Sequence, residues 1–212
     1  MCKSFETSIS TFAFSLACVA VSATMCKTKE VYFASAFILT FSLIQLIDAG
    51  IWWSISHKNH ALNHVLTRYA TPVVLMSELL VSYFGIKYMF GWSNRYFEYG
   101  LATFVIGALG TWIFKNCNHA NAHTLPHIDG YLHWCGVEFS TMVRFSFIFF
   151  LLFPILVGMP SKYAMMKYVL TIPIITTFVM NFMNTTFGSR WCWSSNITSA
   201  LFLAYSAMQA NV

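Results

Sequence analysis

This chain contains very few charged residues of either sign. Charged residues make up 9% of the 212 residues, against about 25% in a typical soluble domain. So few charges cannot cover a water-exposed surface, whereas a surface that faces lipid needs none. The sequence also contains no linker, because no stretch is polar enough or rich enough in Gly and Pro to form one. With 58% hydrophobic residues, the composition predicts one polytopic membrane domain over residues 1–212.

Further absences narrow the function. The basic residues are scattered singly, so the clustered basic stripe that binds nucleic acid is lacking. P-loop, GxSxG and Rossmann motifs are also absent. A retinal protein needs a lysine in its last span, and residues 191–208 contain none. We therefore expect no cofactor, and a bilayer as the main partner.

Seven stretches are long and apolar enough to cross a bilayer, which takes about 20 residues as a helix. The expected fold is therefore an all-α membrane bundle of about seven transmembrane helices, because a spanning segment must satisfy its own backbone hydrogen bonds. The predicted spans are Ser8–Thr24, Val31–Ile55, Leu62–Tyr83, Tyr96–Phe114, Leu132–Met159, Tyr163–Met183 and Trp191–Met208.

Basic residues in the short loops set the orientation, since cytoplasmic loops are richer in Lys and Arg. The bias places the N-terminus outside and the C-terminus in the cytoplasm. A rival interpretation is that the first segment is a signal peptide cleaved near Val21-Ser22-Ala23. The first, third and fifth loops carry Lys27, Lys29, Lys87, Arg95, Lys162 and Lys167, against Lys3, Lys58, Arg68, Lys115 and Arg190 on the other side.

Five short motifs occur along the chain: Met1-Cys2-Lys3-Ser4, Leu43-Ile44-Gln45-Leu46-Ile47-Asp48, Trp52-Trp53, His133-Trp134 and Gly188-Ser189-Arg190-Trp191-Cys192-Trp193. Together they resemble a family of small seven-span proteins of unknown function from bacteria and from large DNA viruses of algae and protists. That family begins Met-Cys-x-Ser, carries Gln and an acid in its second span, and opens its last span with Trp-Cys. The chain departs in having Asp48 where Glu is expected and Lys3 where an aromatic residue is usual. The resemblance implies an architecture and no activity.

Ionisable residues inside the predicted spans are the candidate site. A charge at the bilayer centre costs about 2.5–3.5 kcal/mol and usually faces the bundle interior. Most of these residues fall in the predicted outer half, and we expect Asp48 and Glu138 to share one cavity there. Two interpretations stay open: an outward pocket for a small ligand or cation, or structural ion pairs such as Arg144 with Glu78 or Asp48. The candidate pocket residues are Gln45, Asp48, Arg68, Glu78, Glu138, Arg144 and Asn196.

All seven histidines, and four of the six cysteines, lie on or near the predicted outer face. That face is oxidising, so we expect a Cys2–Cys192 disulfide, with Cys117 as the alternative partner. The histidines fit no zinc-finger or HExxH spacing, and a solvated loop explains them as well as a metal site does. The weak metal candidates are His119, His123, His127 and His133.

Three functions are compatible with these features. The first is an outward-facing protein that binds or transports a small molecule or ion. The second is a structural membrane protein whose buried charges are only ion pairs. The third, less favoured, is a membrane enzyme that uses outer-face Cys and His residues. Whether the protein is an enzyme stays open, with a non-enzymatic role favoured, and no feature identifies a substrate or an oligomeric state.

Overall fold

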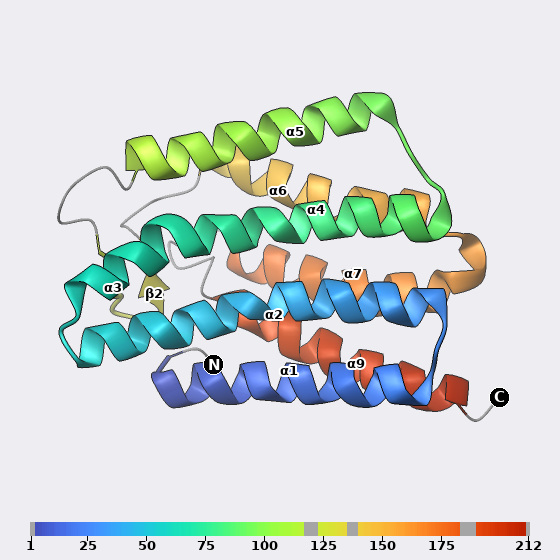
Figure 1. Ribbon diagram of the computed structural model, residues 1–212, viewed down its shortest axis with the longest axis horizontal. Coiled ribbons are helices and arrows are strands. Elements are labelled where there is room, and N and C mark those ends of the chain that lie inside the picture. The colour runs from blue at the N-terminus through green and yellow to red at the C-terminus, as the bar shows by residue number, and fades with distance from the viewer. Residues whose placement is uncertain (1–2, 117–122, 135–139, 183–189, 211–212) are drawn as a thin grey trace.

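The computed structural model describes residues 3–116, 123–134, 140–182 and 190–210. Within these ranges the chain forms an up-and-down bundle of helices, with α1 beginning at one end and α9 finishing at the other (Figure 1). The helices are α1 (Phe5–Met25), α2 (Lys29–Ser56), α3 (His60–Val65), η1 (Leu66–Ala70), α4 (Thr71–Phe90), α5 (Arg95–Gly110), η2 (Thr111–Asn116), α6 (Thr141–Phe153), η4 (Pro154–Gly158), η5 (Ser161–Tyr163), α7 (Ala164–Asn181) and α9 (Cys192–Ala210).

Several of these elements join end to end into longer helices. Among the described residues, six continuous helices are long and apolar enough to cross a membrane. The chain is therefore an all-α, multi-pass membrane protein. Helix α9 falls where the seventh span is predicted, but it is more polar than the other six. The six are Phe5–Met25, Lys29–Ser56, His60–Phe90, Arg95–Phe114, Thr141–Gly158 and Ser161–Asn181.

The predicted start of the fifth span at Leu132 is wrong. Leu132 belongs to a two-stranded antiparallel hairpin of β1 (Leu125–Pro126) and β2 (Leu132–His133), and α6 begins only at Thr141. The turn between the strands contains Asp129-Gly130. Gly130 has φ = 80°, a left-handed conformation that glycine adopts without strain. We call the end of the bundle that carries this hairpin the hairpin end.

A proline reshapes the helix that follows α3. In the π-helical turn η1, the backbone N–H of Thr71 bonds to the Leu66 carbonyl, five residues back. The next residue, Pro72, has no N–H, so the Thr67 carbonyl has no partner within its own helix. The Trp112 indole donates to that carbonyl at 3.0 Å. The kink in one helix is therefore stabilised by a side chain from η2.

Small hydroxyl residues form the contact between α1, α2 and α9. Ser8, Ser15 and Ser22 recur every seven residues along α1, and all three are fully buried. That period keeps them on one face of the helix, and small side chains let membrane helices approach closely. Ser15 contacts Ser195 and Ser199 of α9, which are also fully buried.

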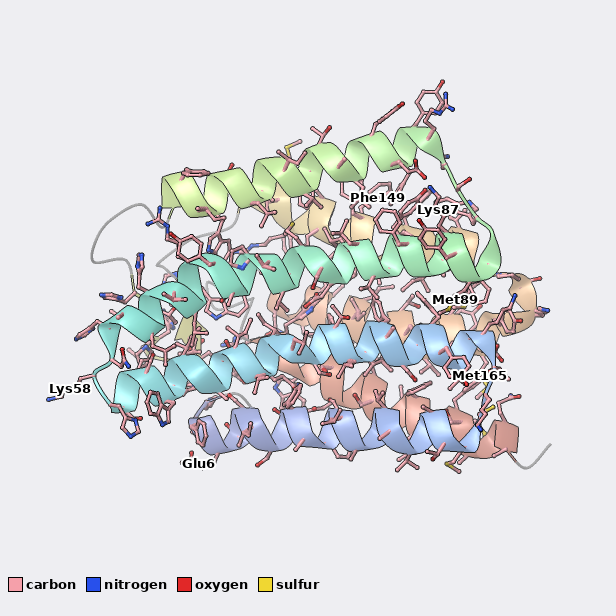
Figure 2. The ribbon with its side chains drawn as sticks, viewed as in Figure 1. Glu6, Lys58, Lys87, Met89, Phe149 and Met165 are labelled. Atoms are coloured by element: carbon pink, nitrogen blue, oxygen red, sulfur yellow. The ribbon has the colours of Figure 1, made fainter. Side chains whose placement is uncertain are left out.

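The two ends of the bundle differ in their polar contacts. Figure 2 shows Lys58 at the turn between α2 and α3, and Lys87 at the opposite end of the bundle. Near Lys87, the carboxylate of Glu98 accepts bonds from Lys87 and from the Tyr83 hydroxyl. Helix α4 ends just beyond at Gly91, whose φ of 77° is again left-handed. These contacts join α4 to α5 at the end away from the hairpin.

We expect Ser15→Leu to destabilise the protein, because a larger side chain cannot fit between α1 and α9. Overpacking of this kind costs about 1–3 kcal/mol, whereas Ser15→Ala should cost only about 0.6 kcal/mol, the average for a hydrogen bond between membrane helices. Ser10→Leu, on the exposed side of the same helix, is the matched control. Thermal melts in detergent would test this, and equal melting temperatures for the two leucine variants would contradict it.

Candidate functional site

The predicted amides and the serines of α1, α2 and α9 form one hydrogen-bonded layer. The Asn196 Oδ1 atom faces Gln45 Nε2 and Ser15 Oγ, both at 3.4 Å. Ser195 lies 2.8 Å from Ser42, and Ser199 donates to Ser15 at 3.0 Å. These groups largely satisfy one another, as buried polar groups must. We call Ser15, Ser42, Ser195 and Ser199, with Gln45 and Asn196, the serine layer.

Asp48 lies one turn beyond Gln45 on the same face of α2, and it is fully buried. The Trp134 indole donates to Asp48 Oδ1 at 3.0 Å. Trp134 follows directly after strand β2, so the hairpin supplies a hydrogen-bond donor to an acid inside the bundle. Trp134 is itself 4% exposed and packs with Leu132 and Ile44 in a small apolar cluster. The hairpin therefore closes this end of the bundle.

Glu78 is a second fully buried acid, on α4. Within the described residues, neither of its carboxylate oxygens has a partner at good hydrogen-bond geometry, although the Trp191 indole faces the carboxyl. An ionised carboxylate in such surroundings is costly. Glu78 is one of several buried side chains in the described ranges with polar atoms that have no hydrogen-bond partner.

An apolar groove lies between α4, α5 and α6. Its cavity volume is about 60 Å³, well below the roughly 300–1,000 Å³ of an enclosed ligand pocket, so the groove has room for only part of a molecule. Three tryptophans from separate parts of the chain line it, and Arg144 is the one charged residue among its walls. The lining residues are Pro72, Leu75, Met76, Phe104, Ala108, Trp112, Trp134, Val143, Arg144, Phe147 and Trp191.

Arg144 does not pair with the buried acids in the described part of the chain. Its Nη1 donates to the Phe182 carbonyl, and its guanidinium lies 5.9 Å from the centre of the Phe182 ring. The ion pairs between described residues are instead Lys87–Glu98, which joins α4 to α5, and Arg190–Asp129 at the hairpin, where His127 Nδ1 lies 3.2 Å from Asp129. The geometry thus offers no support for an Arg144 pair with Glu78 or Asp48.

The predicted site residues separate into groups. Gln45, Asp48 and Asn196 lie together along α2 and α9, while Arg144 lines the groove. Arg68 lies on η1, with its guanidinium over the Tyr69 ring at 5.3 Å. Glu138 is outside the described residues, so its sharing a cavity with Asp48 stays a prediction. The predicted Cys2–Cys192 disulfide also stays a prediction. The described part of the structure does not include Cys2, Cys117 or the side chain of Cys192.

Sequence reasoning missed Asp129, which anchors the hairpin. Asp129 Oδ2 accepts a bond from Arg190 Nη2 at 2.7 Å, and Asp129 Oδ1 lies 3.2 Å from His127 Nδ1 and accepts from the Tyr131 backbone N–H at 3.1 Å. The Arg190 guanidinium also lies over the Tyr131 ring at 4.7 Å. The Asp-Gly dipeptide, a strong hairpin signal, was the available clue.

The histidines gather at the hairpin end in two clusters. His127 and His133 face each other in the hairpin, with ring centres 5.9 Å apart. His123 lies against His60 and His64 of α3. Within the described ranges, no three His, Cys, Asp or Glu side chains stand ready to hold a metal ion. His119 is outside those ranges.

Comparison with known protein families, curated proteins and solved structures returned no match. The resemblance to the seven-span family of bacteria and large DNA viruses therefore stays a prediction.

We expect Trp134→Phe to lower the melting temperature, because it removes a hydrogen-bond donor from the buried Asp48 carboxyl. Removal of one partner of a buried polar group costs about 1–3 kcal/mol. The cost should shrink when Asp48 is also changed to Asn, which a double-mutant cycle would measure. Trp193→Phe, at an indole that is 42% exposed, is the control. If Trp134→Phe melts like Trp193→Phe, the contact contributes nothing.

Proposed function

We propose that this protein binds a small amphipathic molecule, with an apolar body and an acidic headgroup, in the groove between α4, α5 and α6. The observation that carries the proposal is the composition of the groove wall: three tryptophans and two phenylalanines beside a single arginine. Aromatic side chains offer large rigid apolar surfaces for a ligand. The wall thus favours a hydrophobic molecule over a hydrated ion.

Arg144 favours an acidic headgroup. Arginine presents five N–H donors in a planar fork that matches a carboxylate or a phosphate, and the Phe182 carbonyl accepts from one of them. An arginine within a span is costly unless it faces a partner or a cavity. Arg144 lines the groove, and its positive charge would attract a ligand with a negative headgroup and repel a cationic one.

Helix α5 gives the ligand a way in from the bilayer. It lies at the edge of the bundle (Figure 1), and few of its side chains are buried: Phe97, Leu101 and Val105. Exposed large residues such as Ile106 and Phe114 face away from the bundle. A hydrophobic molecule dissolved in the membrane would therefore meet the groove laterally. This property suits a receptor or carrier for a lipid-soluble compound.

Quenching of tryptophan fluorescence by a long-chain fatty acid brominated on its acyl chain would test this function. We expect saturable quenching by the acid in the purified protein, and weaker quenching by the matching brominated alcohol. Arg144→Gln should lower affinity for the acid about tenfold or more, since a charge-assisted hydrogen bond contributes about 1.5–3 kcal/mol. It should leave binding of the alcohol unchanged.

Two variants control this experiment. Ala108→Trp should fill the groove and abolish saturable quenching by both compounds. Arg95→Gln removes an exposed arginine at the start of α5, far from the groove, and should change neither. The function is wrong if the acid still quenches saturably in Ala108→Trp, or if Arg144→Gln and the parent bind the acid equally.

We propose further that α9 is a seventh span, with the N-terminus and the hairpin end outside. The excess of Lys and Arg on the loops at the opposite end supports this orientation. Packing of α9 against α1 and α7 supports its place in the bundle.

Accessibility of single cysteines would test this orientation. In a variant that lacks the native cysteines, we expect an impermeant thiol reagent outside intact cells to label Ile128→Cys but not Ser93→Cys. Ile128 is 98% exposed at the tip of the hairpin, and Ser93 is exposed between α4 and α5 at the other end. Labelling of Ser93→Cys alone would reverse the topology.

A further inference from the structure

Three imidazoles converge at the hairpin end, outside the groove. His60 and His64 are four residues apart on α3, so they project from the same side of the helix. His123 approaches them from the segment that precedes the hairpin. Its ring centre lies 5.1 Å from that of His60 and 6.1 Å from that of His64.

These spacings are close to those of a metal site. Two imidazoles that bind one tetrahedral ion through nitrogen at about 2.0–2.1 Å place their ring centres about 5 Å apart. The His60–His123 pair meets that spacing, and the His64–His123 pair is wider by about 1 Å. The three rings therefore do not yet point at one position, which agrees with the absence of a ready metal-holding group in the described ranges. Binding of an ion therefore requires His64 and His123 to change side-chain rotamers, which brings their rings closer and turns their nitrogens toward one position.

Among the described residues, one nitrogen of His123 has no hydrogen-bond partner. Its Nδ1 atom is buried and makes no hydrogen bond among the described residues. An unsatisfied buried polar atom costs about 1–3 kcal/mol, and a metal ion would supply the missing partner.

The backbone beside His123 is fixed against the same helix. Thr124 donates its backbone N–H to Asn63 Oδ1 at 2.9 Å, and its carbonyl accepts from Asn63 Nδ2 at 3.1 Å. The hydroxyls of Thr124 and Thr67 lie 2.7 Å apart. Asn63 lies between the two helical histidines. These bonds hold His123 over the His60–His64 face, and such support from neighbouring residues keeps a ligand set in place.

From this arrangement we infer that His60, His64 and His123 bind a divalent transition-metal ion of the zinc type, with water as the fourth ligand. Imidazole ligands suit Zn²⁺, Cu²⁺ and Ni²⁺. The ion ties the segment before the hairpin to α3 and so secures the closure of this end of the bundle. Its role is structural, and it stands independently of any ligand in the groove.

Metal titration of the intact, tag-free protein after treatment with a chelator would test this site. We expect one equivalent of Zn²⁺ to raise the melting temperature, and Co²⁺ to give the visible absorption bands of tetrahedral coordination. His123→Asn, His60→Ala and His64→Ala should each weaken Zn²⁺ binding at least about tenfold. His123→Asn should melt like the parent in chelator, which separates loss of the metal from loss of the fold.

Two further variants serve as matched controls. His57 lies just before α3 but stacks on Trp53 at 4.3 Å between ring centres, and His127 belongs to the other histidine cluster. We expect His57→Gln and His127→Gln to bind Zn²⁺ as the parent does. The site is disproved if Zn²⁺ causes no thermal shift, if His123→Asn retains parental affinity, or if His127→Gln loses it.

Discussion

Inside a bilayer, no water is available to complete an unfinished hydrogen bond, and each polar group must find its partner within the protein. The described contacts follow from that constraint. The Thr67 carbonyl, left without a partner by Pro72, bonds to Trp112. Asp48 receives the Trp134 indole, and the serine layer largely bonds to itself. In each case the partner comes from a distant part of the chain, so these bonds fix which helices pack together.

Hydropathy alone predicted the helices, because a run of about 20 apolar residues has no alternative to helix in lipid. Hydropathy placed the start of the fifth span wrongly at Leu132, because an apolar residue in a buried hairpin has the same local hydropathy as one in a transmembrane helix. The Asp129-Gly130 turn and Pro126 were the contrary evidence. The serine repeat along α1 was also readable, but serine is neither charged nor apolar enough to stand out in a hydropathy profile.

For the candidate site, the cost of a charge in lipid correctly placed Asp48 and Glu78 in the interior, where both are fully buried. It could not say which groups would meet there. Asp48 accepts a hydrogen bond from Trp134, a residue 86 positions away. That contact depends on the β1–β2 hairpin, whose second strand was predicted to be part of the fifth transmembrane helix. The groove could not be predicted from the sequence for a related reason. Its walls are ordinary apolar residues, which form a cavity only when the helices are packed together.

Trp134 connects the two parts of the bundle that differ most in packing. On one side lie α1, α2 and α9, joined by close contacts between small residues. On the other side, α5 and α6 pack through large aromatic side chains, and the groove lies along them. The Trp134 indole donates to Asp48 in the first part, while its ring lies 6.4 Å from that of Trp112 and lines the groove. A molecule that enters the groove therefore contacts the same side chain that satisfies the buried acid. Movement of Trp134 would change the hydrogen bonding of Asp48, so groove and acid are coupled through one residue.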